Sequence, residues 1–298
     1  MNNNFNLYCK SYRNDVLRAF ELLRSIEQYN INSIPFFIST PEKDKLIFKN
    51  KLGLIGYEWV ADEEIASLNK MANINDLERL PGSITQQIIK SEFWRMGTSK
   101  AYLCLDSDSI FIKNFSLSDF QAENGNTYTI AHSSKEFFNE ANEAGQNYIY
   151  KNFQKESSNI KSIFMREGED YDFGPSPYVW HKDVWNWLSN YLKSEKNMSL
   201  WDVIGLYGTE DRWYGEALLK SRAIDFVPIK PLFKVYHYKW QYINDQKKGV
   251  NLDKLRKNYI GLISQSNWDK RLDSEYGKKK KISKIFRNIK NLFSIKKI

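Results

Sequence analysis

The first hundred residues alternate short apolar runs with longer segments in which apolar residues recur every three or four positions. The apolar runs predict strands at 5–9, 34–39, 57–60 and 101–105. The periodic segments predict helices at 14–29 and 83–95, with a further helix opening at Pro41 or Glu42. Strands that alternate with helices are typical of a parallel sheet with helices on both faces. The pattern therefore predicts an α/β fold with a mostly parallel central sheet.

The second half of the chain is less regular. Short apolar runs predict strands at 127–132, 178–180, 224–227 and 235–238. We expect helices at 183–192 and 211–220, and helix with loops over the polar stretch 137–167. No internal repeat or Gly/Ser-rich linker divides the sequence before about residue 265. We therefore predict one domain over residues 1–265 and a separate C-terminal tail over residues 266–298.

Two aspartates follow the apolar run 101–105 and are the strongest candidates for chemistry. Asp106 and Asp108 are one residue apart, so on a continuing strand their side chains would point to the same face. Neighbouring carboxylates repel each other unless a positive group lies between them. Mg²⁺ and Mn²⁺ prefer one or two protein carboxylates together with phosphate oxygens and water. The pair indicates a divalent cation that carries phosphate, although so short a motif also occurs by chance in surface turns.

The helix predicted before this strand carries three polar side chains close together. Gln86 and Lys90 share one face, and Gln87 lies beside Lys90. Two amides and an ammonium group near the aspartates could hold a sugar hydroxyl and a phosphate. The alternative interpretation is an ordinary polar helix face.

A further polar group follows the first predicted strand. Lys10, Ser11 and Tyr12 come directly after the apolar run 5–9. Ligands of parallel sheets bind beyond the carboxyl ends of the strands. We therefore expect these residues and the two aspartates to line one crevice.

Composition narrows the class of protein. Aromatic residues make up 15% of the 298 residues, which favours a packed globular protein over a disordered chain. Cys9 and Cys104 show no metal or redox spacing, so we interpret them as reduced strand residues of a cytoplasmic protein. The N-terminus lacks a signal-peptide pattern, and no apolar run approaches the roughly 20 residues of a membrane span.

The net charge of +8 comes from the C-terminus. Residues 276–298 contain eight Lys, one Arg and no acidic residue, so the preceding 275 residues carry 35 basic and 36 acidic side chains. A nucleic-acid-binding domain usually has a basic face on its folded body. Because this body is almost neutral, we expect no nucleic-acid partner.

Five short motifs occur in order between residue 5 and about residue 240. They are Leu7-Tyr8-Cys9-Lys10-Ser11-Tyr12, Gln86-Gln87-Ile88-Ile89-Lys90, Leu105-Asp106-Ser107-Asp108, Gly174-Pro175-Ser176-Pro177 and Glu210-Asp211-Arg212-Trp213-Tyr214-Gly215. By their order and spacing they resemble GT-A-type glycosyltransferases of bacterial surface-polysaccharide pathways, in particular the uncharacterised DUF6492-type family. The resemblance implies a GT-A-like, Rossmann-like fold, a nucleotide-sugar donor, a divalent cation (Mn²⁺ or Mg²⁺), and a saccharide or lipid-linked acceptor.

The resemblance also implies roles for individual positions at the donor end. Asp108 would ligate the metal, and Asp106 would hold ribose, the metal or a metal-bound water. Lys10, Ser11 and Tyr12 would lie near the base and phosphates. The three polar residues of the preceding helix would complete the donor site.

Later positions supply the remaining candidates. In many GT-A enzymes a histidine from a late strand completes the metal shell, and His237 is the best-placed candidate here, ahead of His132 and His181. The alternative interpretation of His237 is a histidine satisfied within its strand. Glu210 and Asp211 stand where a turn gives way to a helix, and they are the candidate catalytic pair.

Two readings of this acidic pair stay open. Carboxylates at a helix N-terminus can simply stabilise the helix dipole. The functional reading makes Asp211 a general base that removes the proton of the acceptor hydroxyl while the donor phosphate leaves. In an inverting reaction Asp211 would perform this step, whereas in a retaining reaction it would position the acceptor.

The basic tail has the pattern of an amphipathic helix. Six apolar side chains fall within about 120° of a helical wheel: Ile282, Ile285, Phe286, Ile289, Leu292 and Phe293. Together with the run Lys278 to Lys281, this pattern suits an anionic membrane surface. We expect peripheral contact of residues 278–298 with the inner face of the bacterial cytoplasmic membrane. A helix docked on the body and a disordered basic end are the competing readings.

Two other functions compete with a glycosyltransferase. A haloacid-dehalogenase-type phosphatase also places a D-x-D after an apolar strand, with the first aspartate as nucleophile and the second as acid/base. Its motif usually lies near the N-terminus and continues to Thr or Val, whereas Ile110 occupies that position here. A non-enzymatic carbohydrate-binding or scaffold protein is the second alternative.

Overall fold

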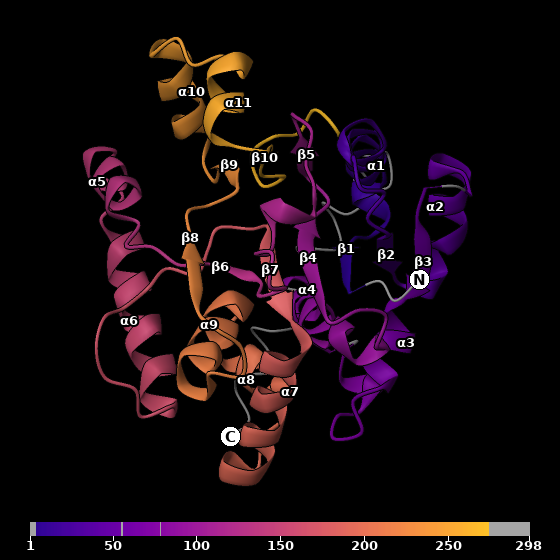
Figure 1. Ribbon diagram of the computed structural model, residues 1–298, viewed down its shortest axis with the longest axis vertical. Coiled ribbons are helices and arrows are strands. Elements are labelled where there is room, and N and C mark those ends of the chain that lie inside the picture. The colour runs from indigo at the N-terminus through magenta and orange to yellow at the C-terminus, as the bar shows by residue number, and fades with distance from the viewer. Residues whose placement is uncertain (1–3, 55, 78, 274–298) are drawn as a thin grey trace, which may run out of the picture.

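The central sheet has the order β3-β2-β1-β4-β7 (Figure 1). The computed structural model describes residues 4–54, 56–77 and 79–273, and within them this five-stranded sheet is the largest. Its strands are β1 (Phe5–Lys10), β2 (Phe36–Thr40), β3 (Glu58–Ala61), β4 (Ala101–Asp106) and β7 (Tyr178–His181). The first four are parallel, and β7 runs antiparallel to β4. The mostly parallel sheet predicted from the sequence is confirmed.

Helices cover both faces of this sheet (Figure 1). One face packs against α1 (Val16–Tyr29) and α2 (Lys45–Leu52). The other face packs against α3 (Asp62–Ser67), α4 (Gly82–Glu92), α7 (Lys182–Tyr191), α8 (Leu200–Leu206) and α9 (Glu210–Ser221). Since both faces are buried, the strands read as continuous apolar runs rather than as alternating ones.

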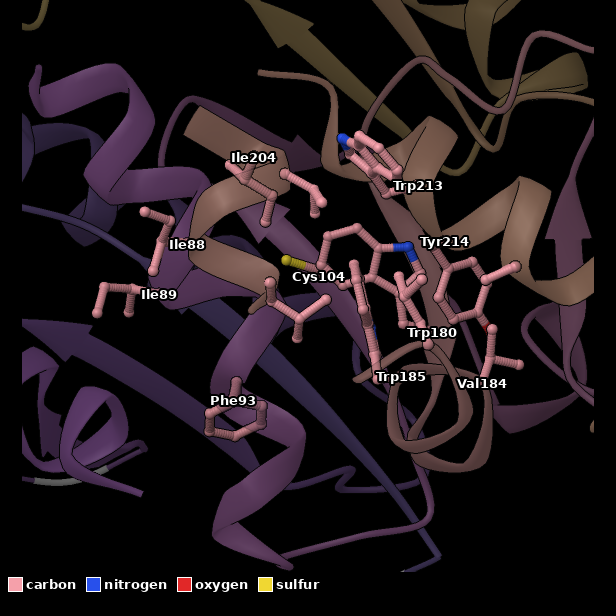
Figure 2. Close-up of a cluster of buried hydrophobic side chains, with 14 of the residues drawn as sticks. Ile88, Ile89, Phe93, Cys104, Trp180, Val184, Trp185, Ile204, Trp213 and Tyr214 are labelled. Atoms are coloured by element: carbon pink, nitrogen blue, oxygen red, sulfur yellow. The ribbon is translucent and has the colours of Figure 1, made fainter. Parts of the chain in front are cut away.

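Two hydrophobic cores follow from the alternation of side chains along the strands. In β1, Tyr8 points into one core, whereas Leu7 and Cys9 point into the other. Figure 2 shows the first core, where Trp180 of β7 lies among Trp185 of α7 and other aromatic and aliphatic side chains. The indole ring of Trp180 meets that of Trp185 edge-on, with ring centroids 5.0 Å apart. Many of the aromatic residues thus belong to the core.

Up to residue 273, two small sheets and four further helices complete the second half. Their strands are β5 (Ser109–Phe111), β6 (Tyr128–Ile130), β8 (Val227–Ile229), β9 (Phe233–Tyr236) and β10 (Gly261–Ser264). Their helices are α5 (Lys135–Glu143), α6 (Tyr148–Ile163), α10 (Lys239–Lys247) and α11 (Leu252–Asn258). Strand β10 pairs with β5 and β9, and β6 pairs with β8. Figure 1 shows α5 and α6 along one side of the molecule and α10 and α11 at its top.

Several predicted boundaries differ from the structure. The strand expected at 224–227 is wrong, because Ile224 and Phe226 pack against the first core from a loop and β8 begins only at Val227. The helix expected at 83–95 ends at Glu92 and tightens into a 3₁₀ turn that closes at Gly97, whose φ is 67°. Helices α3, α8, α10 and α11 were not predicted, because none of them is longer than nine residues and so short a segment shows little helical periodicity.

Three observations concern membrane contact and the predicted C-terminal tail. Among the described helices, none is long and apolar enough to cross a membrane. The amphipathic helix expected in residues 276–298 lies outside the described residues. Residues 266–273, the first part of the predicted tail, contact the body through Asp108 and Arg18.

Candidate functional site

The register of the central sheet brings the two predicted donor-site groups together. Lys10 at the end of β1 is the register partner of Asp106 at the end of β4. Strand β4 stops at Asp106 and β5 starts at Ser109, so Ser107 and Asp108 form the turn between them. The sequence analysis expected strand alternation to place Asp108 on the same face as Asp106. In the structure the turn places Asp108 instead. Both aspartates nevertheless lie at the carboxyl edge of the sheet.

Lys90 of α4 makes the central polar contacts at this edge. Its ammonium nitrogen lies 2.9 Å from Asp106 Oδ1 and 2.9 Å from Glu210 Oε1, and the residue is only 3% exposed. Gln86 donates a hydrogen bond of 3.3 Å from Nε2 to the same Asp106 oxygen. The predicted proximity of Gln86 and Lys90 to Asp106 is seen in the structure.

The charges of this cluster support one another. Burial alone would lower the pKa of Lys90, but Asp106 and Glu210 outweigh it and raise the pKa well above its usual value. Burial alone would raise the pKa of Asp106, but the Lys90 ammonium outweighs it and lowers the pKa. Lys90 is therefore a cation and Asp106 an anion at neutral pH.

Asp108 has a different environment. Its Oδ2 atom accepts a hydrogen bond of 2.9 Å from the backbone N–H of Ser266. Burial, followed by repulsion from Asp106, raises the pKa of Asp108 to about 7. The negative charge of Asp108 is thus incompletely compensated by the protein.

The remaining predicted donor-site residues take separate positions. Lys10 lies 2.8 Å from Asp62 Oδ2 and donates to the Ser11 carbonyl oxygen at 2.7 Å. Ser11 is buried, whereas Tyr12 is 40% exposed at the start of the next turn. Asp62, at the start of α3, was not singled out by the sequence analysis.

Gln87 lies beside Gly208 of the turn that precedes α9. A Cβ atom built on Gly208 would lie 3.1 Å from Gln87 Nε2, so this amide packs against the turn that precedes α9. Gln87 therefore supports the position of α9, whereas Gln86 contacts Asp106.

The acidic pair at the start of α9 splits into two roles. Glu210 is buried and bound to Lys90, so it faces the interior. Asp211 lines a cavity of about 950 Å³ in the second half of the chain. Burial, opposed by Arg212 and assisted by Glu210 and Asp172, raises the pKa of Asp211 to about 7. Of the two predicted catalytic carboxylates, only Asp211 reaches this cavity.

The cavity has mixed polar and aromatic walls. Helices α5 and α6 contribute Phe137, Phe138, Tyr148 and Phe153, and other segments contribute Asp172, Tyr178, Lys234, His237 and Tyr238. Asp106 and Asp108 are not among its lining residues. Tyr178 joins the two regions, because it lines the cavity and its ring centroid lies 5.6 Å from Lys90 Nζ.

Another carboxylate of the cavity wall, Asp172, was missed by the sequence analysis. Asp172 accepts hydrogen bonds from the Ser134 hydroxyl and, at 3.0 Å, from the Gly174 backbone N–H. A Cβ atom built on Gly174 would lie 3.4 Å from both Asp172 Oδ1 and Asp211 Oδ2. Asp172 and Asp211 therefore flank Gly174, within the Gly/Pro segment that carried one of the motifs. In the sequence, Gly174 was the signal that could have pointed to this part of the cavity.

The three histidines have different hydrogen-bond partners. His237 lines the cavity, its Nδ1 lies 3.2 Å from the Gln265 amide nitrogen, and burial lowers its pKa, so the imidazole is neutral. His132 contacts the Gly174 carbonyl oxygen with Nε2 at 2.7 Å. His181 accepts a hydrogen bond from the Asp183 N–H and caps α7.

The carboxylates at this edge could provide only part of the ligands of a divalent cation. Within the described residues, no three His, Cys, Asp or Glu side chains form a ready-made metal cluster. Mg²⁺ and Mn²⁺ that accompany phosphates need only one or two protein carboxylates, because phosphate and water supply the other ligands. The half-buried carboxylate of Asp108, whose pKa is raised, would be stabilised by such a cation. The side chains at this edge therefore fit a divalent ion that arrives with a phosphate-bearing ligand.

Comparison with known proteins gives a match to a protein family and none to a curated protein. The chain matches no curated protein. Residues 5–289, which are nearly the whole chain, match a family of unknown function, DUF6492. The chain therefore belongs to the DUF6492 family.

Proposed function

We propose that this protein is a metal-dependent glycosyltransferase of GT-A-like fold. It moves a hexosyl-type sugar from a nucleoside-diphosphate donor to a saccharide or lipid-linked acceptor in bacterial surface-polysaccharide (capsule or lipopolysaccharide) synthesis. The observation that carries the proposal is the buried bridge from Asp106 through Lys90 to Glu210. This bridge joins the carboxyl edge of a parallel sheet, where such folds bind ligands, to the helix that presents Asp211 to a large cavity.

The donor end is supported by charge. Lys90 is a buried cation beside Asp106, and Lys10 reaches the same edge from β1. Asp106, Asp108 and His237 would hold Mn²⁺ or Mg²⁺ together with the donor diphosphate, and the ion would offset charge on the leaving diphosphate. Ser11 and Tyr12 border the base, and Gln86 orients Asp106.

The acceptor end is supported by the cavity. Aromatic faces pack against the apolar faces of sugar rings, and carboxylates accept hydrogen bonds from sugar hydroxyls. Asp211 Oδ2 receives the proton of the acceptor hydroxyl, because a carboxylate whose pKa lies near the working pH is well matched to that task. Glu210 holds Lys90 and takes no proton from the acceptor.

The location of the enzyme is part of the same proposal. A basic amphipathic segment at 278–298 would hold the protein at the inner face of the cytoplasmic membrane, where lipid-linked acceptors are found. These residues lie outside the described part of the chain.

A donor panel tests the proposal. The full chain is incubated with UDP-, GDP-, CMP- and ADP-sugars, each with Mn²⁺, with Mg²⁺ and with EDTA. Metal-dependent release of the nucleoside diphosphate from one donor class is the expected result. Release of inorganic phosphate from simple phosphate esters would favour the phosphatase alternative, and absence of both turnover and metal-dependent nucleotide binding would favour a scaffold.

A further inference from the structure

The turn that follows β10 contacts both candidate metal ligands that lie outside the central sheet. Gln265 continues the ladder of β10, since its N–H donates to the Tyr236 carbonyl oxygen at 3.3 Å. Its carbonyl oxygen then accepts from the N–H groups of Trp268 and Asp269 at 3.2 and 3.0 Å, which closes the turn. The turn is therefore a defined structure with its own backbone hydrogen bonds.

Consecutive residues of this turn reach two different segments. The Gln265 amide nitrogen lies 3.2 Å from His237 Nδ1. The Ser266 N–H donates to Asp108 Oδ2 at 2.9 Å. Asn267 continues on the side of His237, with its amide nitrogen 3.4 Å from the His237 carbonyl oxygen. Adjacent residues of one turn thus contact both Asp108 and His237.

A buried arginine fastens the turn to α1. Arg18 is 4% exposed, and its guanidinium donates to the Asp269 carbonyl oxygen at 2.8 Å and to the Asp273 carboxylate at 2.6 Å. Its other terminal nitrogen lies 2.8 Å from Asp15 Oδ1. Because a planar guanidinium that binds three acceptors has little freedom, the turn is held against the body on the side of Asp108.

We propose that the Gln265–Asp269 turn, fixed by Arg18, positions Asp108 and His237 for the divalent cation. This inference rests on the proposed function, since it concerns the metal of the donor site. Groups that orient metal ligands typically change metal affinity 10- to 100-fold when they are removed. Gln265 and the Ser266 backbone are positioning groups, because they act through His237 and Asp108.

The experiment uses two variants that remove one contact each. Ser266→Pro removes the N–H that Asp108 accepts, and Ser266→Ala is its matched control because it keeps that N–H. Gln265→Ala removes the amide beside His237, and Gln246→Ala, an exposed glutamine on α10, is the matched control. Mn²⁺ binding is measured by electron paramagnetic resonance with the full chain, in the presence of UDP and of GDP, and nucleotide binding is measured again in EDTA.

The expected result is specific to the metal. Ser266→Pro and Gln265→Ala should weaken Mn²⁺ binding about tenfold or more, while both controls and metal-free nucleotide binding stay at wild-type values. Should Ser266→Pro fail to fold, as judged by circular dichroism, Gln265→Ala decides alone. Wild-type Mn²⁺ affinity in the folded variants overturns this inference and leaves the proposed function standing. A wild-type chain that binds no Mn²⁺ with either nucleotide overturns both.

Discussion

Lys90 on α4 and Glu210 at the start of α9 form a buried ion pair, with Nζ 2.9 Å from Oε1. The two residues are 120 positions apart in the sequence. Because the same ammonium binds Asp106, the pair links the D-x-D turn to the helix that carries Asp211. The donor edge and the cavity are thereby held in one arrangement.

Replacing Lys90 by an uncharged residue should lower the free energy of unfolding. Lys90→Met leaves the buried Glu210 and the partly buried Asp106 without a countercharge, and we expect a loss of about 3–5 kcal/mol of unfolding free energy. Urea denaturation measures the change, and Lys239→Met, at an exposed position on α10, is the control. A loss no larger than that of the control would contradict the assigned role of Lys90.

Asp211→Asn tests the general base. An amide cannot accept the proton of the acceptor hydroxyl, so turnover should fall about 10²- to 10⁴-fold while metal-dependent donor binding is retained. Wild-type turnover should rise with pH through about 7, because the carboxylate of Asp211 is the active form. Turnover within twofold of wild type in the asparagine variant would remove Asp211 from the reaction.

The same substitution should change how stability depends on pH. The pKa of Asp211 is about 7 in the folded chain and 3.8 ordinarily, so between these pH values the folded chain keeps a proton that the unfolded chain has released. Stability is therefore lost as pH rises from about 4 to about 7. We expect the difference in Tm between Asp211→Asn and wild type to be more positive at pH 8 than at pH 5. A difference that is the same at both pH values would show that the carboxyl is not strained by burial.

A glycine on α9 offers a steric test of the cavity wall. A Cβ atom on Gly215 would lie 2.2 Å from the Phe173 ring, next to Asp172, so Gly215→Ala must displace that ring and should destabilise the protein. At Gly205 on α8 nothing lies within 4 Å of a built Cβ, so Gly205→Ala should gain up to about 1 kcal/mol from helix propensity. Guanidinium denaturation of both variants measures the contrast, and equal effects would mean that Phe173 yields freely.

Removing residues 276–298 tests the membrane prediction. The shortened chain should lose binding to vesicles that contain anionic lipid, while neither form binds neutral vesicles. Flotation of the two forms with both kinds of vesicle measures this. Unchanged binding of the shortened chain to anionic vesicles would place the contact elsewhere.

The central sheet was predictable because its strands are buried on both faces. The runs at 5–9 and 101–105 become β1 and β4 almost unchanged, and their register places Lys10 opposite Asp106. The proximity of Gln86 and Lys90 to Asp106 was also foreseen, since the helix leads directly into that strand.

The rest of the site depends on contacts between distant segments. Pairing of Glu210 with Lys90, and of Gln265 with His237, has no local signal in the sequence. Asp172 lies in a loop between elements, where neither periodicity nor spacing marks it. Asp108 was predicted by strand alternation but is placed by a turn, which left its partner Ser266 unforeseen.

Asp108→Ala gives the most direct test of the central claim. Binding of the panel's best nucleotide-sugar is measured by titration calorimetry with Mn²⁺ and with EDTA, in wild type, in Asp108→Ala and in Asp253→Ala, an exposed control on α11. The account predicts that the variant folds normally and loses the Mn²⁺-dependent part of binding, while the control keeps it. Full metal-dependent binding by a folded Asp108→Ala variant would contradict the account, because the donor site would then lie elsewhere.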